Sequence, residues 1–389
     1  MARPLTVVPA HPVSAVVDAL TDALAGSTTL CVLPHAPAPP GQDWPSALHL
    51  DQPVPGDVAA VVATSGSSGA PRAVLLTARS LLASAHATLR RLCGPGAWLL
   101  ALPVSSIGGL QVLVRSRLAD LEAVSVDGSA GFRVEAFVEA ARRLPAGLPH
   151  YTSLVPTQLS RLVHDGAGVD ALAGFDAVLV GGGPLDDRLR AEATAAGVRI
   201  VSTYGMTETA GGCVYDGIPL DGVYVRASPN GLQIGGDVVA LGYHAAPDET
   251  RESFVDGWFQ TRDAGMVDDS GRVSVIGRLD DVIISGGVNV AAGAVEEVLR
   301  GRPDITDAAV LGRPDAEWGQ AVIALVVPAD GESIDLADVR AYVSARLGTA
   351  AAPRAVICVP ALPRLHSGKL DRVAAQLLAA AGPTPDDAP

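Results

Sequence analysis

Short apolar runs alternate with amphipathic stretches along the first 205 residues, and this alternation is the strongest constraint on the fold. A strand and then a helix, repeated several times, is typical of an α/β domain whose strands are largely parallel. Strands are expected at 29–34, 57–64, 97–104, 176–184 and 198–205, with helices at 78–92, 133–144 and 186–196. The run at 176–184 is expected to finish in a glycine loop.

Two further helices are indicated by apolar spacing together with signals at their ends. Val13, Val16, Val17, Leu20 and Leu24 recur at helical spacing, and Gly26 follows as a C-terminal stop. Near the other end of the chain, Leu336, Val339, Val343 and Leu347 lie between Asp335, a candidate N-cap, and Gly348.

The sequence pattern changes after about residue 215. From there, short expected strands and Gly/Asp turns replace the alternation of strands and helices. The last hundred residues form a separate pattern of strands and helices. We therefore expect an α/β N-terminal domain over 1–279 with a β-rich end, and a small, mobile α+β C-terminal domain over 280–389.

Composition excludes several classes of function. The chain has 389 residues, 48% of them hydrophobic, and a formal net charge of −14, which argues against a nucleic-acid partner. Its 4 cysteines show no CxxC spacing, so neither a disulfide framework nor a zinc site is indicated. No apolar run approaches the roughly 20 residues of a membrane helix. These features predict a soluble cytoplasmic protein without membrane insertion, and a homodimer stays an open alternative.

The stretch "TSGSSGAPR" (64–72) follows an expected strand and is rich in hydroxyls and glycines. Such a loop can surround a phosphate with backbone N–H groups and side-chain hydroxyls. It lacks the Gly-Lys-Ser/Thr of a Walker loop, and a simple turn between strands is the alternative.

"YGMTETAGG" (204–212) also follows a strand. Tyr204 can stack on a flat base, Thr207 can hold a phosphate oxygen, and Glu208 can bind Mg²⁺. The alternative is a polar helix start with an N-terminal cap.

"WFQTRDAG" (258–265) and "GRLDD" (277–281) supply a carboxylate at Asp263, suited to ribose hydroxyls, and a guanidinium at Arg278. The alternative is a pair of charged turn residues. A dinucleotide loop at the glycines 181–183 is disfavoured, because the last glycine of GxGxxG is missing and Pro184 follows at once.

These motifs are followed by "SGK" (367–369). Their order resembles that of the adenylate-forming superfamily, which includes acyl- and aryl-CoA ligases, adenylation domains and luciferases. The resemblance extends from about Asp57 to Arg372. The resemblance implies ATP, Mg²⁺ and coenzyme A as ligands, with Glu208 as the metal ligand and Lys369, Glu208 and Thr207 as catalytic residues. It further implies a nucleotide site formed by Thr64, Ser65, Gly66, Ser67, Ser68, Gly69, Arg72, Gly181, Gly182, Gly183, Ser202, Tyr204, Thr207, Asp263 and Arg278.

Lys369 is the only lysine among 28 basic residues. In the family a lysine of the mobile C-terminal domain reaches the carboxylate and the bridging phosphate oxygen while the adenylate forms. A compact ammonium can contact several oxygens at one centre, whereas a planar guanidinium is larger and differently aimed. Asp280 corresponds to the family's hinge, and Gly286 and Gly287 to its path for coenzyme A.

Three stretches, 102–116, 153–162 and 204–223, are similar to the o-succinylbenzoate–CoA ligase family of menaquinone biosynthesis. By this resemblance the carboxylic acid lies near Ser105, Ser106, Gly109, Arg115, Ser153, Met206, Gly211 and Gly212. Arg115 is expected to face the substrate's second, unreactive carboxylate; the alternative is a surface arginine at a helix end.

The sequence departs from the family pattern at three places: Arg72 replaces a lysine, Arg262 replaces a glycine, and Ser105–Ser106 replace an aromatic residue or histidine. The alternatives are a ligase for another aryl or short acyl acid, or an adenylation domain that loads a separate carrier protein. A non-catalytic nucleotide sensor is disfavoured, because sensing does not require Lys369 together with Glu208 and Asp263.

Overall fold

The structure is a computed structural model, and it describes residues 3–34, 38, 42–65, 71–92, 94–128, 131–315, 317–364 and 370–381. The chain forms two compact units. The first comprises Met1–Arg226, Gln233–Gln260 and Val267–Val273, and the second comprises Ala227–Leu232, Thr261–Met266 and Ser274–Pro389. The predicted boundary at 279/280 stays a prediction, since the short β-rich segments before it are divided between the two units.

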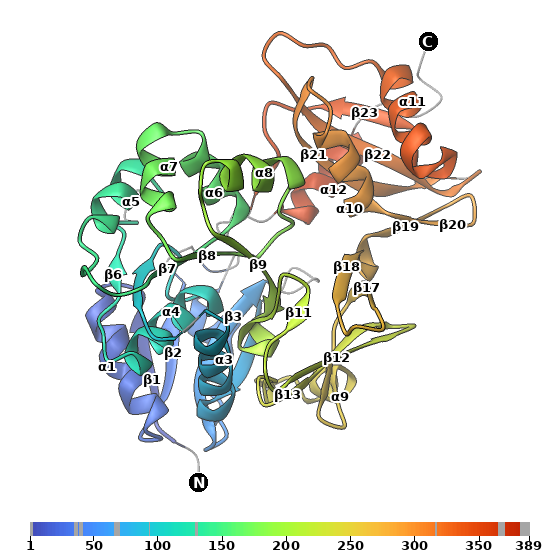
Figure 1. The fold of residues 1–389 in the computed structure, drawn as a ribbon. Helices are drawn as coiled ribbons and strands as arrows, with labels where there is room; N and C mark the ends of the chain where they lie inside the picture. The colour runs from blue at the N-terminus through green and yellow to red at the C-terminus, as the bar shows by residue number, and fades with distance from the viewer. Residues whose placement is uncertain are drawn as a thin grey trace. The chain divides into compact units, whose positions relative to one another are not determined.

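A five-stranded sheet forms one layer of the first unit (Figure 1). Its strands, in spatial order, are β1 (Leu5–Pro9), β2 (Thr29–Leu33), β3 (Val58–Ser65), β4 (Pro71–Thr77) and β14 (Gly242–Tyr243). The first three strands are parallel, and β4 and β14 are antiparallel to their neighbours. Helix α1 (Val13–Leu24) packs on β1, β2 and β3, and the short helix α2 (Trp44–Ala47) follows β2.

A seven-stranded sheet forms the second layer, and most of its strands are parallel as predicted. In spatial order the strands are β11 (Ile218–Pro219), β10 (Gly211–Tyr215), β9 (Ile200–Met206), β8 (Ala177–Val180), β7 (His150–Leu154), β5 (Ala97–Leu100) and β6 (Val124–Ser125). Only β10 and β11 run antiparallel to their neighbours. Several strands are shorter than predicted: β5 stops at Leu100, before Pro103, which cannot donate to a strand ladder.

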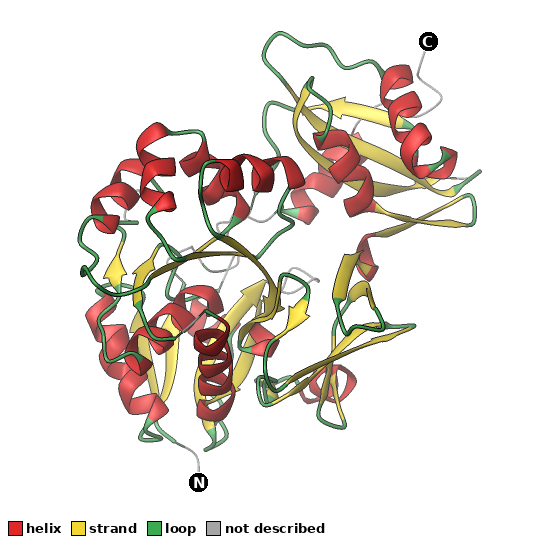
Figure 2. Cartoon of the chain, in the orientation of Figure 1, coloured by secondary structure: helices red, strands yellow, loops and turns green. Residues whose placement is uncertain are grey.

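Helices cover both faces of the seven-stranded sheet. Helices α3 (Ala78–Arg91) and α4 (Ile107–Leu118) pack against each other and contact strands of both sheets. The opposite face carries α5 (Val134–Ala141), α6 (Pro156–Val163), α7 (Gly166–Ala173) and α8 (Asp187–Ala195). Figure 2 shows these helices in red around the strands. Phe137, Leu159, Leu172 and Phe175 are buried between the helices and the sheet.

Short strands follow the seven-stranded sheet in the chain, as the change in sequence pattern after about residue 215 predicts. They are β12 (Val223–Ser228), β13 (Gly231–Gly236), β15 (Phe254–Val255) and β16 (Trp258–Gln260) in one sheet, and β17 (Asp263–Val267) and β18 (Val273–Arg278) in another, with helix α9 (Pro247–Ser253) before β15.

The second unit is an α+β domain built on its own sheet. Its elements are β19 (Val282–Ser285), β20 (Val288–Ala291), α10 (Ala292–Arg300), β21 (Ile305–Asp315), β22 (Gly319–Pro328), α11 (Leu336–Leu347), β23 (Ala355–Cys358) and α12 (Arg372–Ala381). Helices α10 and α11 cover one face of β21–β22, and α12 covers the other. Asp335 accepts a hydrogen bond from the Asp338 N–H at 3.0 Å, which confirms the predicted N-cap of α11.

Among the described residues, no helix is long and apolar enough to cross a membrane.

Close approach of β5 and β7 requires a glycine at position 96. A Cβ there would lie 2.4 Å from the Pro149 carbonyl oxygen and 2.6 Å from the Tyr151 ring. We expect Gly96→Ala to lower the free energy of unfolding by about 1–3 kcal/mol, because the backbone must shift to relieve the clash. Chemical denaturation measures this change. Gly166→Ala, at the exposed start of α7 with nothing within 4 Å of its Cβ, is the control. An equal loss in both variants would contradict the packing argument.

Candidate functional site

The two ends of the predicted phosphate loop belong to the paired strands β3 and β4. Thr64 pairs with Arg72 and Ser65 with Pro71, so the two ends of the loop are held side by side. The Thr64 hydroxyl donates to the Arg72 carbonyl oxygen at 3.5 Å. Residues 66–70, including the predicted Gly66, Ser67, Ser68 and Gly69, lie outside the described residues. The pairing confirms that a strand precedes the predicted loop, and the conformation of the loop and its phosphate contacts stay predictions.

Arg72 is the second residue of β4, and its side chain lies beside two residues from later in the chain. Its Nε lies 2.7 Å from Oε2 of Glu249 in α9, and its guanidinium carbon lies 5.3 Å from the centre of the Tyr243 ring. The Glu249 side chain is 48% exposed, so this ion pair is worth no more than about 1 kcal/mol. Arg72 therefore remains available to a stronger anion such as phosphate.

Glu208 lies in a short 3₁₀ helix, η1 (Thr207–Thr209), directly after β9. Its carbonyl oxygen accepts from the Ala240 N–H at 2.8 Å, and its Oε1 accepts from the Tyr243 hydroxyl at 2.9 Å. Within the described part of the chain, Oε2 has no hydrogen-bond partner. Burial and the neighbouring Glu208 carboxylate raise the pKa of Tyr243, so its hydroxyl stays a proton donor at neutral pH.

The residues around Glu208 fit a magnesium ion bound together with nucleotide. No group of three or more His, Cys, Asp or Glu side chains that could hold a metal occurs among the described residues. Mg²⁺ usually takes one or two protein carboxylates and completes its shell with substrate phosphates and water. A half-buried carboxylate with one oxygen held by Tyr243, and the other without a hydrogen-bond partner among the described residues, matches this requirement.

The strands β7, β8 and β9 are parallel neighbours, and predicted residues lie within β7 and β9 and directly after β8. Ser153 lies near the end of β7 and is buried, Gly181–Gly183 follow β8, and Ser202, Tyr204 and Met206 belong to β9. Ligands of open α/β sheets bind at such carboxyl ends, particularly where neighbouring connections diverge. The fold therefore brings these residues to one edge of the sheet.

Glycine at 181 is explained by packing: a Cβ there would lie 2.2 Å from Thr203 Oγ1. Gly182 has φ +79°, in the left-handed region that favours glycine. These constraints would hold without a ligand, so they do not by themselves assign Gly181, Gly182 or Gly183 to the nucleotide.

Three of the predicted substrate residues, Ser105, Ser106 and Gly109, lie at the start of α4. Ser106 is its N-cap: its hydroxyl accepts from the Gly109 N–H at 3.3 Å and donates to the Pro103 carbonyl at 2.7 Å. A Cβ on Gly211 would lie 3.3 Å from Cγ of Gln111, whose amide donates to the Ala210 carbonyl at 2.9 Å. The segment containing Gly211 thus packs directly on α4, beside Ile107 and Gln111.

Arg115 lies in the last turn of α4 and is 3% exposed, so the alternative of a surface arginine is wrong. Its guanidinium carbon lies 5.0 Å from the centre of the Trp98 ring, and its Nε has no hydrogen-bond partner. No carboxylate pairs with it in the described chain. Burial lowers the pKa of the Arg115 guanidinium, although the neighbouring Tyr215 opposes this. A buried cation without a counter-ion favours the approach of an anion.

Asp263 and Arg278 lie together in the second unit. Arg278 Nη1 is 3.5 Å from Oδ1 of Asp263, which is 7% exposed; Asp263 begins β17 and Arg278 ends β18. They are thus not two unrelated turn residues. Their contacts with ribose stay a prediction.

The predicted hinge and coenzyme A residues also lie in the second unit. Asp280 belongs to a 3₁₀ helix, Leu279–Asp281. Gly286 and Gly287 form the two-residue turn of the β19–β20 hairpin with φ of +60° and +79°, as a type I′ turn requires. Lys369 lies outside the described residues, and its role stays a prediction from the sequence.

The sequence analysis did not identify Tyr243 and Glu249. In the structure, Tyr243 contacts Glu208 and Glu249 contacts Arg72. Tyr243 is 35 residues from Glu208 in sequence, and no local motif links the two. The pairing of β14 with β4 creates the contact, and the two residues Gly242–Tyr243 are too short a strand to predict.

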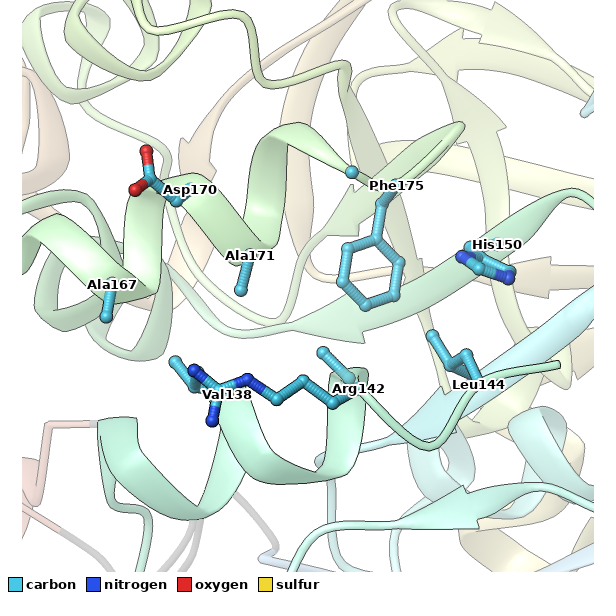
Figure 3. Close-up of a pocket in the computed structure, with 10 residues that line it drawn as sticks. Val138, Arg142, Leu144, His150, Ala167, Asp170, Ala171 and Phe175 are labelled. Carbon is cyan, nitrogen blue, oxygen red and sulfur yellow. The ribbon is translucent and has the colours of Figure 1, made fainter. Parts of the chain in front are cut away.

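The described part of the chain also has a groove of about 380 Å³ between α5 and α7 (Figure 3). Val138, Ala171 and Phe175 form its walls, and Arg142, His150 and Asp170 lie along it. None of the predicted site residues lines this groove, so it is separate from the site described above.

Two family models match the chain. The model described as AMP-binding enzyme matches residues 7–241, and the model described as AMP-binding enzyme C-terminal domain matches residues 294–369. Among curated relatives, the chain is 46% identical over 334 residues to the probable 2-succinylbenzoate–CoA ligase of Mycobacterium tuberculosis, covering 84% of this chain and 86% of that protein. It is 33% identical to the sulfoacetate–CoA ligase of Cupriavidus necator, covering 84% and 68%.

Among solved structures, the o-succinylbenzoate CoA synthetase of Bacillus subtilis in complex with its acyl-adenylate has the same fold, with a TM-score of 0.81 and 22% identity over 96% of this chain and 88% of that one. The amide bond synthetase McbA of Marinactinospora thermotolerans is 26% identical with a TM-score of 0.74, covering 96% and 79%. With both family models matched and a relative at 46% identity along most of its length, the chain belongs to the AMP-binding, adenylate-forming enzyme family.

Proposed function

We propose that the protein is an ATP-dependent o-succinylbenzoate–CoA ligase of menaquinone biosynthesis, acting in the cytoplasm. The observation that carries this proposal is the 46% identity to the mycobacterial relative over 84% of the chain. The buried, unpaired guanidinium of Arg115 supports it, because o-succinylbenzoate has a second carboxylate that does not react.

The reaction has two steps. A carboxylate oxygen of the acid attacks the α-phosphorus of ATP, and the bond to pyrophosphate breaks. The thiol sulfur of coenzyme A then attacks the acyl carbon and loses its proton, and AMP leaves. Neither step needs a covalent enzyme intermediate, so catalysis rests on positioning and on stabilising charge.

The chain's residues take the following roles in this proposal. Arg72 and the loop at 64–69 bind phosphates, Tyr204 stacks on adenine, and Asp263 accepts hydrogen bonds from ribose hydroxyls. Thr207 binds a phosphate oxygen and Glu208 holds Mg²⁺, which when bound neutralises phosphate charge. Lys369 donates to the reacting oxygens in the first step, and the C-terminal domain then turns at Asp280 to present Gly286 and Gly287 to coenzyme A.

Two relatives define the alternative substrates. The sulfoacetate–CoA ligase acts, by its name, on an acid with a different second anion, and the amide bond synthetase is named for another kind of bond. An enzyme like the sulfoacetate–CoA ligase would use a different acid. An enzyme like the amide bond synthetase would transfer the acyl group to an amine in place of coenzyme A. A panel of acids, assayed with and without coenzyme A, separates both from the proposal.

We expect o-succinylbenzoate to give the highest kcat/KM in such a panel, measured as ATP-dependent pyrophosphate release and thioester formation. A tenfold preference for a monocarboxylic benzoate, a fatty acid or sulfoacetate corresponds to about 1.4 kcal/mol in the transition state and would exclude this substrate. The adenylate-forming family assignment would be unaffected by that result.

Arg115→Ala should raise KM for o-succinylbenzoate by about tenfold or more, and should raise it much less for a matched monocarboxylic acid. Only the dicarboxylate has a second charge that is left unpaired when the guanidinium is removed. The ratio of the two KM values is the measurement, since any loss of stability affects both acids alike. Equal changes would make Arg115 a structural residue that stacks on Trp98.

Lys369→Ala should slow adenylate formation by on the order of 10²–10³, because a preorganised cation at the developing charge is lost. The same variant given synthetic acyl-adenylate should form thioester at close to the wild-type rate. Asp280→Pro should show the reverse pattern, because a fixed φ at the hinge hinders rotation. Single-turnover assays of each half-reaction distinguish the two, and equal slowing of both steps by Lys369→Ala contradicts the alternating mechanism.

A further inference from the structure

Tyr243 has a fixed position at the edge of the five-stranded sheet. It is 6% exposed, and its backbone is held on two sides: β14 pairs with β4, and the Tyr243 N–H donates to Thr250 Oγ1 at 2.9 Å. Phe254 packs edge-on against its ring at 5.4 Å between ring centres. The phenol is therefore anchored before any ligand binds.

Glu208 is attached to the same segment at two points. Its carbonyl oxygen accepts from Ala240 N–H at 2.8 Å, and its Oε1 accepts from the Tyr243 hydroxyl at 2.9 Å. A glutamate has three rotatable side-chain bonds, and a hydrogen bond to one carboxylate oxygen restricts all of them. The other oxygen, Oε2, accepts no hydrogen bond from the described residues and stays open to a cation.

Tyr243 also contacts the strand that leaves the predicted phosphate loop. Its Cα partner across the ladder is Val74, and the guanidinium of Arg72 lies 5.3 Å from its ring centre. The Arg72 side chain contacts the ring, and the hydroxyl contacts Glu208. One side chain therefore lies between a cation expected to bind phosphate and a carboxylate expected to bind the metal.

We propose that Tyr243 is the positioning residue of the metal site: its hydroxyl holds Oε1 of Glu208 so that Oε2 faces the metal ion of the bound metal–nucleotide complex. This inference rests on the proposed function only in taking ATP and Mg²⁺ as ligands, and it does not depend on the identity of the acid. Tyr243 acts through Glu208 and does not touch the metal.

A purely structural role for Tyr243 makes a different prediction. If the hydroxyl only satisfied a buried carboxylate, its loss would lower stability and weaken ATP binding to the same extent with or without metal. A positioning role affects only the metal-dependent part of the binding. Hydrogen-bond partners of metal ligands typically contribute 10–100-fold to metal affinity.

The test is calorimetric titration of the full-length protein with α,β-methylene-ATP, which cannot form an adenylate, in buffer with Mg²⁺ and in buffer with EDTA. For Tyr243→Phe we expect the Kd in Mg²⁺ to rise about tenfold and the Kd in EDTA to change less than about twofold. Glu208→Gln should show the same pattern, because the amide oxygen still accepts from Tyr243 while the charge that attracts the metal is gone.

Tyr151→Phe is the matched control. Tyr151 is also buried, it belongs to β7, and its hydroxyl donates to the Leu92 carbonyl at 2.6 Å. It should leave both Kd values unchanged even if its thermal stability falls. Raising the Mg²⁺ concentration should restore the ATP affinity of Tyr243→Phe, since the carboxylate is still present, whereas a folding defect would not respond.

The proposal is overturned if Tyr243→Phe raises both Kd values by the same factor, if it raises neither, or if excess Mg²⁺ fails to restore its affinity. It is also overturned if the wild-type affinity for the ATP analogue does not depend on Mg²⁺. No acid or coenzyme A is present in these titrations. If o-succinylbenzoate is not the substrate, the titrations still test the role of Tyr243. If the role of Tyr243 is disproved, the o-succinylbenzoate assignment is unaffected.

Discussion

The parallel register of β7, β8 and β9 determines where the chemistry of the first unit can occur. These strands are neighbours in one sheet, so the polypeptide leaves all three at the same edge. Ser153, Gly181 and Met206, which are far apart in sequence, are brought there by strand pairing alone. The antiparallel return of β10 then packs Gly211 against α4, and this contact joins the predicted acid-binding residues to the strand that leads into Glu208.

Several helices and turns of the fold can be predicted from local sequence signals. Helical spacing and end signals predicted α1 and α11 with their terminal residues, because an N-cap side chain and a left-handed glycine act over only a few residues. The glycines at 286 and 287 are likewise explained by a two-residue turn. Element ends were less predictable: the helix expected at 133–144 spans Val134–Ala141, with Pro145 following soon after.

Long-range contacts account for what the sequence did not predict. The hydrogen bond between Tyr243 and Glu208 depends on a two-residue strand joining the edge of a sheet, and no residue pattern of that length is distinctive. The burial of Arg115 depends on the packing of α4 between two layers, whereas its place near a helix end equally suggested a surface position. In both cases tertiary packing, rather than local propensity, decides the environment of the charged group.

Packing on an aromatic ring explains how arginine can occupy position 72, beside the predicted phosphate loop, where the family pattern has a lysine. A guanidinium is planar and stacks on aromatic rings, and the structure uses this repeatedly: Arg115 lies over Trp98, Arg226 over Trp258 and Arg354 over Trp318. Arg72 lies over Tyr243 in the same way, so the wider side chain has an aromatic surface that supports it, and its Nε pairs with Glu249. A lysine would gain less from that ring face. Position 369 has the opposite requirement in the proposed mechanism, since a compact ammonium must reach several oxygens at one reacting centre, and there the chain keeps its single lysine.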